Sequence, residues 1–275
     1  MNERVNSTLT LETPVQAPPQ LRPLYQVDER LAPLYAEIAD CPRCPLARTR
    51  SRTVPGSGPV DARLMLIGEG PGQREDELGL PFVGRAGQFL DELLASIGFE
   101  RAEVYIANVV KCRPPGNRDP LPEELAACGD YLERQIEIVD PLVIATLGRF
   151  SMARWFADAR ISRIHGAIAS FDGRTVIPMY HPAAALRNPA LRDVMKRDFA
   201  KLPALLADQA HTPAAALTSS VAEATVPTPE PPAAIAETPR PVPHVFGTPL
   251  PRTEAIEETT ADEPEWRDPP QERLL

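Results

Sequence analysis

The chain has 275 residues, of which 43% are apolar, so it is long enough for one or two domains and is not a small scaffold that needs disulfides for its core. Acidic residues outnumber basic ones by 38 to 29, but residues 207–275 alone hold 12 acids and 4 arginines, so the acidic balance belongs to the C-terminal tail. There is no basic and then apolar export signal near the N-terminus, and no apolar run approaches the roughly 20 residues that span a bilayer, so we expect a cytoplasmic protein with no membrane partner.

Residues 1–27 are polar and contain several prolines, which predicts a flexible N-terminal segment ahead of a folded domain at residues 28–206. Within that domain, short apolar runs alternate with amphipathic stretches. The apolar runs are nearly continuous, as expected of strands that are buried on both faces of a sheet. They lie at residues 64–67, 104–110, 142–147 and 175–180.

The stretches between these runs predict helices. Apolar residues recur at helical spacing over residues 86–97, and Gly98 is placed to end that helix. A second helix should begin near residues 120–122, because two glutamates then lie in its first turn, where the positive end of the helix dipole favours acids. Further helices are predicted over residues 149–157 and 191–206. The alternation predicts an α/β fold with a parallel sheet between helices and a ligand site beyond the carboxyl ends of the strands.

The tail at residues 207–275 holds 13 of the 33 prolines, and its only aromatic residues are Phe246 and Trp266. So few large apolar groups do not offset the entropy of ordering the chain, which predicts a disordered, acidic, proline-rich tail. Residues 263–267 and 273–275 are candidates for docking a replication or repair protein, and a solvated linker end is the alternative interpretation.

A glycine-rich turn, GEGPG at residues 68–72, follows the first predicted strand directly. Glycines such as Gly70 let the backbone approach a ligand closely, and Glu69 lies at the rim of the predicted sheet. A tight turn with a solvated glutamate and a phosphate cradle are both alternatives, although the Gly-x-Gly-x-x-Gly spacing is missing. Farther along, Phe82 lies outside the amphipathic stripe, where it either stacks on a planar ligand or packs in the core.

Two further polar residues lie where predicted strands end. Asn108 interrupts an apolar run, and its buried amide would need partners for both its donor and its acceptor. The edge of a nucleobase would supply both, and a role in fixing a neighbouring loop is the alternative. His181 follows the fourth predicted strand, whereas the other three histidines lack such a placement.

The four cysteines form a C-x2-C pair, then 67 intervening residues, then a C-x15-C pair. A reducing compartment argues against structural disulfides, so a site of four thiolates is favoured over simple packing. The spacing does not separate zinc from an iron–sulfur cluster, since both accept four thiolates. The cysteines are Cys41, Cys44, Cys112 and Cys128.

Several of these motifs occur together in one known family. The segments at residues 68–72, 79–87 and 108–115, the His-Pro pair at 181–182 and the four cysteines resemble the family 4 uracil-DNA glycosylases. The resemblance covers about residues 38–206. It implies a three-layer sandwich with a four-stranded parallel sheet between helices, and a [4Fe-4S] cluster held by the four cysteines. It also implies hydrolysis of the N-glycosidic bond of a flipped deoxyuridine in DNA, which releases uracil and leaves an abasic site for base excision repair.

The resemblance also implies a role for each matching residue. Glu69 would lie near the sugar, where its carboxylate offsets developing positive charge and positions a water molecule. His181 would donate a hydrogen bond to uracil O2. Asn108 would read the base edge, and Phe82 would stack on the flipped ring.

Four further assignments come from the same resemblance. Gly70 would let the backbone approach the substrate, and Glu75 would crowd the C5 position and exclude the methyl group of thymine. Leu186 and Arg187, which follow the catalytic histidine, would wedge into the vacated base stack and touch phosphate. A branch of the family that bonds covalently to DNA carries its histidine in an inserted loop, and no such insertion follows the asparagine motif here. The local match at His165 comes after the third strand, so we expect the hydrolytic branch.

The folded part is nearly neutral, so DNA binding would depend on local clusters of basic residues. Seven basic residues near the cysteines are candidates for a phosphate-facing patch, and they are Arg43, Arg48, Arg50, Arg52, Lys111, Arg113 and Arg118. We expect the protein to act as a monomer. The alternative function is a non-catalytic iron–sulfur DNA-binding accessory protein of replication or repair, which would not need the pair Glu69 and His181.

Overall fold

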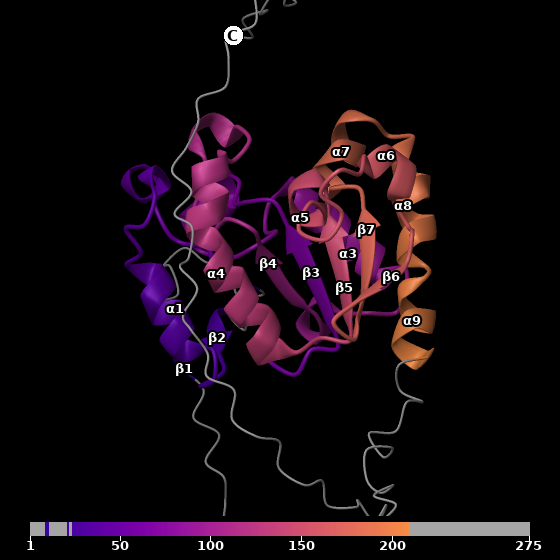
Figure 1. Ribbon diagram of the computed structural model, residues 1–275, viewed down its shortest axis with the longest axis horizontal. Coiled ribbons are helices and arrows are strands. Elements are labelled where there is room, and N and C mark those ends of the chain that lie inside the picture. The colour runs from indigo at the N-terminus through magenta and orange to yellow at the C-terminus, as the bar shows by residue number, and fades with distance from the viewer. Residues whose placement is uncertain (1–8, 11–20, 22–23, 209–275) are drawn as a thin grey trace, which may run out of the picture. The chain divides into compact units, whose positions relative to one another are not determined.

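The computed structural model describes residues 9–10, 21 and 24–208 (Figure 1). Its centre is a five-stranded sheet in the order β4-β3-β5-β7-β6. The strands are β3 (Leu64–Gly68), β4 (Tyr105–Asn108), β5 (Val143–Leu147), β6 (Ala169–Phe171) and β7 (Arg174–Met179). Strands β4, β3, β5 and β7 are parallel, whereas β6 pairs antiparallel with β7 at the edge.

The four predicted parallel strands are confirmed, and β6 is an addition that the sequence did not predict. Its three residues are only partly buried, so it lacks the continuous apolar run that marks the other strands. A second, two-stranded antiparallel sheet pairs β1 (Leu9–Thr10) with β2 (Gln26–Val27).

Helices cover both faces of the large sheet, which confirms the three-layer sandwich (Figure 1). Successive residues of β3 alternate between the faces, so Met65 packs with α1 and α4 while Leu66 packs with the helices of the other face. The first face carries α1 (Ala32–Ala39) and α4 (Pro122–Val139). The second face carries α3 (Arg85–Ala95), α7 (Pro182–Arg187), α8 (Leu191–Phe199) and α9 (Leu202–Asp208).

The remaining elements are short and connect the layers. They are α2 (Gln73–Leu78), α5 (Arg149–Met152), α6 (Ile161–Ile164) and the 3-10 turns η2 (Pro45–Arg48), η3 (Arg101–Glu103) and η4 (Pro115–Asn117). Among the described residues, no helix combines the length and the apolar character that crossing a bilayer requires.

Two of the predicted helices are confirmed closely, and two differ from expectation. Helix α3 gives way to a left-handed Gly98, and α4 begins at Pro122. The helix predicted over residues 149–157 is only the short α5. The helix predicted over residues 191–206 is broken into α8 and α9, because the ring of Pro203 would clash with the carbonyl of Phe199 in a continuous helix.

Residues that precede the predicted start of the domain also join the core. Tyr25 is 1% exposed and its hydroxyl donates to the carbonyl of Leu78 at 2.8 Å, while Val27 packs in the first-face core. The described core therefore begins before residue 28. Ala207 and Asp208, the first two residues of the predicted tail, belong to α9, and the rest of the tail, with its candidate docking residues at 263–267 and 273–275, lies outside the described residues.

Candidate active site

A cavity of about 450 Å³ opens beyond the carboxyl ends of the parallel strands. It brings together residues from four separate segments, as the strand-end rule predicts for a parallel sheet. Seven of the predicted site residues line it, and they are Glu69, Gly70, Glu75, Phe82, Asn108, His181 and Arg187. Leu186 is half-buried on α7 beside this cavity and does not line it.

Asn108 ends β4 at the floor of the cavity. Its side chain is 1% exposed, and its Oδ1 atom is buried without a hydrogen-bond partner. Gly68 of the neighbouring strand β3 leaves room for the Asn108 side chain, because a Cβ at residue 68 would lie 2.4 Å from Asn108 Oδ1 and 2.6 Å from the Phe82 ring. A buried acceptor without a partner is costly, so its presence in a cavity indicates a ligand that donates a hydrogen bond.

Phe82 forms one wall of the cavity and is 5% exposed. Its backbone has the unusual φ of 49°, which costs on the order of 1–3 kcal/mol and is held by the surrounding structure. Gly87 of α3 packs directly beneath it, where a Cβ would lie 1.8 Å from the Phe82 carbonyl oxygen. The Phe82 ring stacks on His181 with centroids 5.5 Å apart and an interplanar angle of 27°.

Glu75 fixes the loop that carries Phe82. Its Oε1 atom accepts hydrogen bonds from the backbone N–H groups of Val83 at 2.9 Å and Gly84 at 2.7 Å. These groups precede α3, where the helix dipole favours a negative charge. The contact supports a role for Glu75 in holding the Phe82 wall in addition to the expected contact at C5 of the base.

His181 follows β7 and begins α7. Its Nδ1 atom accepts a hydrogen bond from the Ala183 N–H at 3.1 Å, so the neutral ring carries its proton on Nε2. Burial of the ring and the positive charge of Arg187 lower the pKa of His181 from 6.5 to about 4. The ring is therefore a neutral hydrogen-bond donor at physiological pH.

Glu69 lies in the turn after β3 and is half-buried. Burial raises the pKa of its carboxyl group above the ordinary value of 4.5, and the negative charge of Asp119 raises it further. The positive charges of Arg149 and Arg187 act in the opposite direction. Four charged groups therefore meet at the mouth of the cavity.

The sequence did not single out Asp119 and Arg149, although both line the cavity. Arg149 comes directly after Gly148 at the carboxyl end of β5, so the strand-end rule applied to that strand would have found it. Asp119 has no such signal, because it lies in the loop between η4 and α4 and reaches the cavity only in the folded chain.

A buried polar network lies beneath the asparagine. Lys111 is 1% exposed, and its ammonium group donates to the backbone carbonyl of Asn108 at 2.7 Å and to Gln135 Oε1 at 2.5 Å. The Gln135 amide in turn donates to the Tyr105 hydroxyl at 2.9 Å, which lies 2.7 Å from the Tyr35 hydroxyl. This network ties the end of β4 to α4 and α1, and it fixes the backbone that carries Asn108.

The predicted phosphate-facing patch is wrong for Lys111, which is buried, and stays a prediction for its arginines, several of which have partners within the protein. Lys111 is buried, Arg43 pairs with Asp130, and Arg118 pairs with Glu124. Arg50 donates to the carbonyls of Ala39 and Cys41 and to Cys112 Sγ, and Arg113 donates to Asn117. Arg50 and Lys111 do contact cysteine sulfur atoms, but no local pattern in the sequence shows the acceptors that engage these basic residues.

The four cysteines all join the first-face core, with Cys112 and Cys128 buried and Cys41 and Cys44 packed against it. Burial raises the pKa of Cys112 to about 11. The Arg50 guanidinium beside it lowers this pKa, whereas the Cys128 and Cys44 thiols raise it further. Burial likewise raises the pKa of Cys128, against Lys111, and the Cys44 and Cys41 thiols add to it. All four thiols therefore lie in one region.

The surroundings of these thiols suit bound thiolates. Arg50 donates to Cys112 Sγ at 3.4 Å, and the backbone N–H of Lys111 donates to Cys128 Sγ at 3.2 Å. Such donors stabilise the deprotonated sulfur that a metal requires. Within the described part of the chain, no three Cys, His, Asp or Glu side chains are grouped tightly enough to mark a metal site by position alone. The donor set fits a four-thiolate group by its chemistry.

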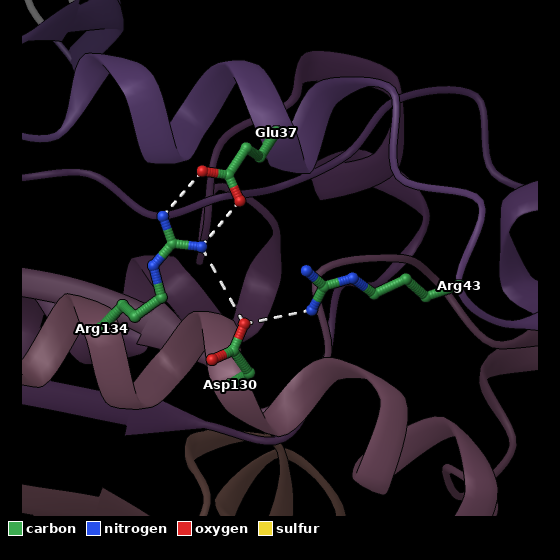
Figure 2. Close-up of polar contacts among 4 residues, drawn as sticks. All are labelled: Glu37, Arg43, Asp130 and Arg134. Atoms are coloured by element: carbon green, nitrogen blue, oxygen red, sulfur yellow. Dashed lines mark hydrogen bonds and ion pairs between the residues drawn. The ribbon is translucent and has the colours of Figure 1, made fainter.

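An ion-pair chain holds the C-x2-C segment against α4 (Figure 2). Arg43, which lies between Cys41 and Cys44, contacts Asp130 at 3.1 Å and covers the Tyr131 ring at 4.3 Å. Asp130 also lies 3.9 Å from Arg134, which makes two 2.7 Å hydrogen bonds to Glu37 of α1. The chain of contacts links α1, the first cysteine pair and the helix that carries Cys128. We call these four residues, Glu37, Arg43, Asp130 and Arg134, the cysteine clamp.

His165 does not belong to the cavity. Its Nδ1 atom lies 2.8 Å from Asp198 Oδ2, and its ring packs against Tyr180 with centroids 4.9 Å apart. Asp198 also contacts Lys201 at 3.5 Å. These contacts give His165 a structural setting on the second face, which agrees with the expectation that it is not the histidine of the covalent branch.

Comparison with known proteins agrees with this site. The model of the uracil DNA glycosylase superfamily matches residues 55–204. A type-4 uracil-DNA glycosylase of Archaeoglobus fulgidus is 47% identical over 183 residues, covering 63% of this chain and 92% of the relative. A type-4 uracil-DNA glycosylase of Thermotoga maritima is 45% identical over 184 residues, which cover 65% of this chain and 95% of the relative. A type-5 uracil-DNA glycosylase of Thermus thermophilus is 32% identical over 152 residues, covering 48% and 69%.

The fold is that of an α/β protein with its candidate site at the carboxyl edge of a parallel sheet, and its relatives make it an enzyme of the DNA glycosylase class. The chain belongs to the uracil DNA glycosylase superfamily, and within it to the type-4 uracil-DNA glycosylases.

Proposed function

We propose that this protein removes uracil from DNA by hydrolysing the bond between uracil N1 and deoxyribose C1′ of a flipped deoxyuridine. The observation that carries the proposal is the buried, unpartnered Asn108 Oδ1 in a cavity that Phe82, His181 and Glu69 also line. The released uracil and the abasic site would start base excision repair. The alternative of a non-catalytic accessory protein is not favoured, since the type-4 relatives are glycosylases by name.

The base edge would be read by Asn108. Its Oδ1 would accept from uracil N3–H, and its amide would donate to O4. Cytosine presents the reverse pattern, which leaves buried groups unpaired at a cost of about 1–3 kcal/mol each. Phe82 would stack on the ring, a contact worth about 1–3 kcal/mol. Glu75 holds the Phe82 loop through two backbone hydrogen bonds, and it would crowd C5 on the same side.

Bond cleavage leaves negative charge on the departing base and positive charge on the sugar. His181 would donate from Nε2 to uracil O2, because its Nδ1 is engaged by Ala183. A fixed donor of this kind stabilises charge that develops in the transition state without reorganising. Glu69 would lie on the sugar side, where its carboxylate offsets the cationic character and orients a water molecule for attack on C1′.

The base must leave the duplex before it enters the cavity, at a cost of a few kcal/mol. Arg187 at the rim would contact phosphate, and Leu186 beside it would fill the vacated stack. Gly70 would let the backbone approach the nucleotide. The turn also needs glycine for its own packing, because a Cβ at residue 70 would lie 2.7 Å from the Val110 side chain. Incubation with a uracil-containing oligonucleotide followed by hot alkali tests the function. Strand breaks at uracil are expected, and an intact strand would refute the proposal.

Replacing Asn108 with alanine is expected to slow uracil release by about tenfold to a hundredfold, because uracil then leaves its N3–H and O4 unpaired. Single-turnover excision measures the effect. The matched control is Thr146→Val, which removes another buried side-chain oxygen without a partner, outside the cavity lining, and should leave the rate unchanged. Equal rates for Asn108→Ala and the wild type would contradict the role of Asn108.

We propose further that Cys41, Cys44, Cys112 and Cys128 hold a [4Fe-4S] cluster. Support comes from the shared region of the four thiols and from the N–H donors at Cys112 and Cys128. When bound, the cluster would supply cross-links between the first cysteine pair and the end of β4, and no redox chemistry is required of it. A brown chromophore in anaerobically purified protein would distinguish iron–sulfur from zinc.

The cysteine clamp should slow the loss of such a cluster. Asp130→Asn removes the partner of Arg43 and weakens the link to Arg134. Exposed ion pairs contribute about 0.2–1 kcal/mol each, so we expect the visible absorbance to bleach about two to five times faster under a chelator. Asp172→Asn, an equal change at the exposed turn between β6 and β7, is the control. Identical bleaching in both variants would contradict the clamp.

The remaining expectations concern the setting of the enzyme. An enzyme that acts on genomic DNA would work where that DNA is held, in agreement with the expected cytoplasmic location. We propose that it acts as a monomer, since one chain supplies every group of the site described above. The proposal that residues 263–267 or 273–275 dock a replication or repair protein concerns residues outside the described part of the chain.

A further inference from the structure

An ion pair spans the mouth of the cavity. Asp119, in the loop before α4, pairs with the guanidinium of Arg149 at the start of α5, and the two residues lie 30 positions apart in the sequence. Both side chains line the cavity and remain 64% and 60% exposed. The pair is therefore accessible from solvent at the point where a flipped nucleotide would enter.

Each partner of the ion pair has a further contact that restrains it. Arg118 makes two hydrogen bonds to Glu124, at 2.9 and 2.7 Å, and also donates to the Asp119 backbone carbonyl at 2.9 Å. The Glu124 side chain is 0% exposed, so this loop is anchored to α4. On the other side, the Arg149 guanidinium stacks over the Phe150 ring at 4.4 Å. The loop backbone and the stacked guanidinium hold Asp119 and Arg149 in place before DNA arrives.

The pair acts on the catalytic carboxylate from the rim. Asp119 raises the pKa of Glu69 after the larger effect of burial, while Arg149 and Arg187 lower it. Two arginines and one aspartate therefore surround the entrance within electrostatic range of Glu69. Two arginines beside a cavity for a nucleotide match the charge of the two phosphates that flank it.

We propose that Arg149 binds a phosphate of the DNA strand next to the flipped nucleotide, and that Asp119 occupies the place of this phosphate in the free protein. The inference rests on the proposed function, because it takes the cavity to receive a nucleotide. Asp119 is a positioning residue that keeps the Arg149 guanidinium oriented toward the mouth until the phosphate replaces it. An exposed ion pair is weak, so this exchange costs little.

Asp119 should therefore compete with DNA, and only through Arg149. The test measures binding of a fluorescein-labelled single-stranded oligonucleotide without uracil by anisotropy at low salt. Asp119→Asn is expected to tighten binding by about two- to fivefold, which corresponds to the loss of one exposed ion pair. Arg149→Ala is expected to weaken binding and to lower the slope of log K against log salt by about one.

The double variant decides the mechanism. If Asp119 acts through Arg149, the Asp119→Asn change should tighten DNA binding in the wild-type background but have little effect in the Arg149→Ala background. The same gain in both backgrounds would show general charge repulsion and overturn the proposal, as would unchanged binding of Asp119→Asn alone. Asp172→Asn controls for removal of one acid, because its turn precedes β7 at the opposite edge of the sheet from the cavity.

Failure of this inference is separable from failure of the function. Uracil release by the wild type is measured on the same preparation. Release of uracil together with equal gains in both backgrounds would overturn the phosphate exchange and leave the glycosylase intact. A coupled pair in a protein that releases no uracil would overturn the function and retain the exchange.

Discussion

Replacing Glu69 with glutamine is expected to lower the single-turnover rate of uracil release by about a hundredfold to ten-thousandfold. This range is typical for removal of a group that orients or deprotonates the attacking water. Glutamine keeps the size of the side chain and removes the negative charge that would offset the cationic sugar. The melting temperature should change little, because Glu69 is only half-buried and burial disfavours the charged form of its carboxyl group.

The pH dependence of the wild type follows from the same carboxylate. Burial and Asp119 raise the pKa of Glu69 above 4.5, so its negative charge is lost at a higher pH than for an ordinary glutamate. The rate should therefore fall as the pH drops through that raised pKa, and Glu69→Gln should lack this fall in its residual rate. Glu77→Gln, an exposed residue of α2, is the matched control. Full activity in Glu69→Gln would refute the assigned role.

Replacing His181 with alanine is expected to lower the rate by about a hundredfold to a thousandfold, the typical cost of losing one donor to a developing anion. The matched control is His165→Ala, because His165 bonds to Asp198 outside the cavity and should not affect the rate. A His181→Ala protein with the wild-type rate would contradict donation to uracil O2.

The lowered pKa of His181 also predicts how the stability of the fold depends on pH. Its folded pKa is about 4 against an ordinary value of 6.5, so the unfolded chain binds a proton first as the pH falls. The wild type should lose stability as the pH falls from 6.5 to about 4, and the full stabilisation from the neutral ring is present only above pH 6.5. His181→Ala should reduce this loss, as thermal melting across that pH interval would show. An unchanged pH dependence would contradict the neutral, buried ring.

Much of the site could be predicted because its residues follow strand ends. Glu69 and His181 follow two of the parallel strands and Asn108 ends a third, and the topology brings such positions to one edge. The resemblance to a known family added a role for each of them. The membership is confirmed by the match over residues 55–204, while the individual roles stay proposals.

Other features depend on contacts that no local pattern records. Lys111 reads as a surface cation in the sequence, yet in the fold its partners are a backbone carbonyl and Gln135, 24 residues away. The pairing of Asp119 with Arg149 joins a loop to a different strand end. Such tertiary pairs are set by packing, and one sequence does not specify them.

The central claim is that the cavity recognises uracil through Asn108 Oδ1. Inhibition of excision by free bases tests it most directly, because N3 is the atom that must donate. Uracil should inhibit, and 3-methyluracil, which has no N3–H and carries a methyl group there, should inhibit at least about tenfold more weakly. Equal inhibition by the two bases would contradict the claim.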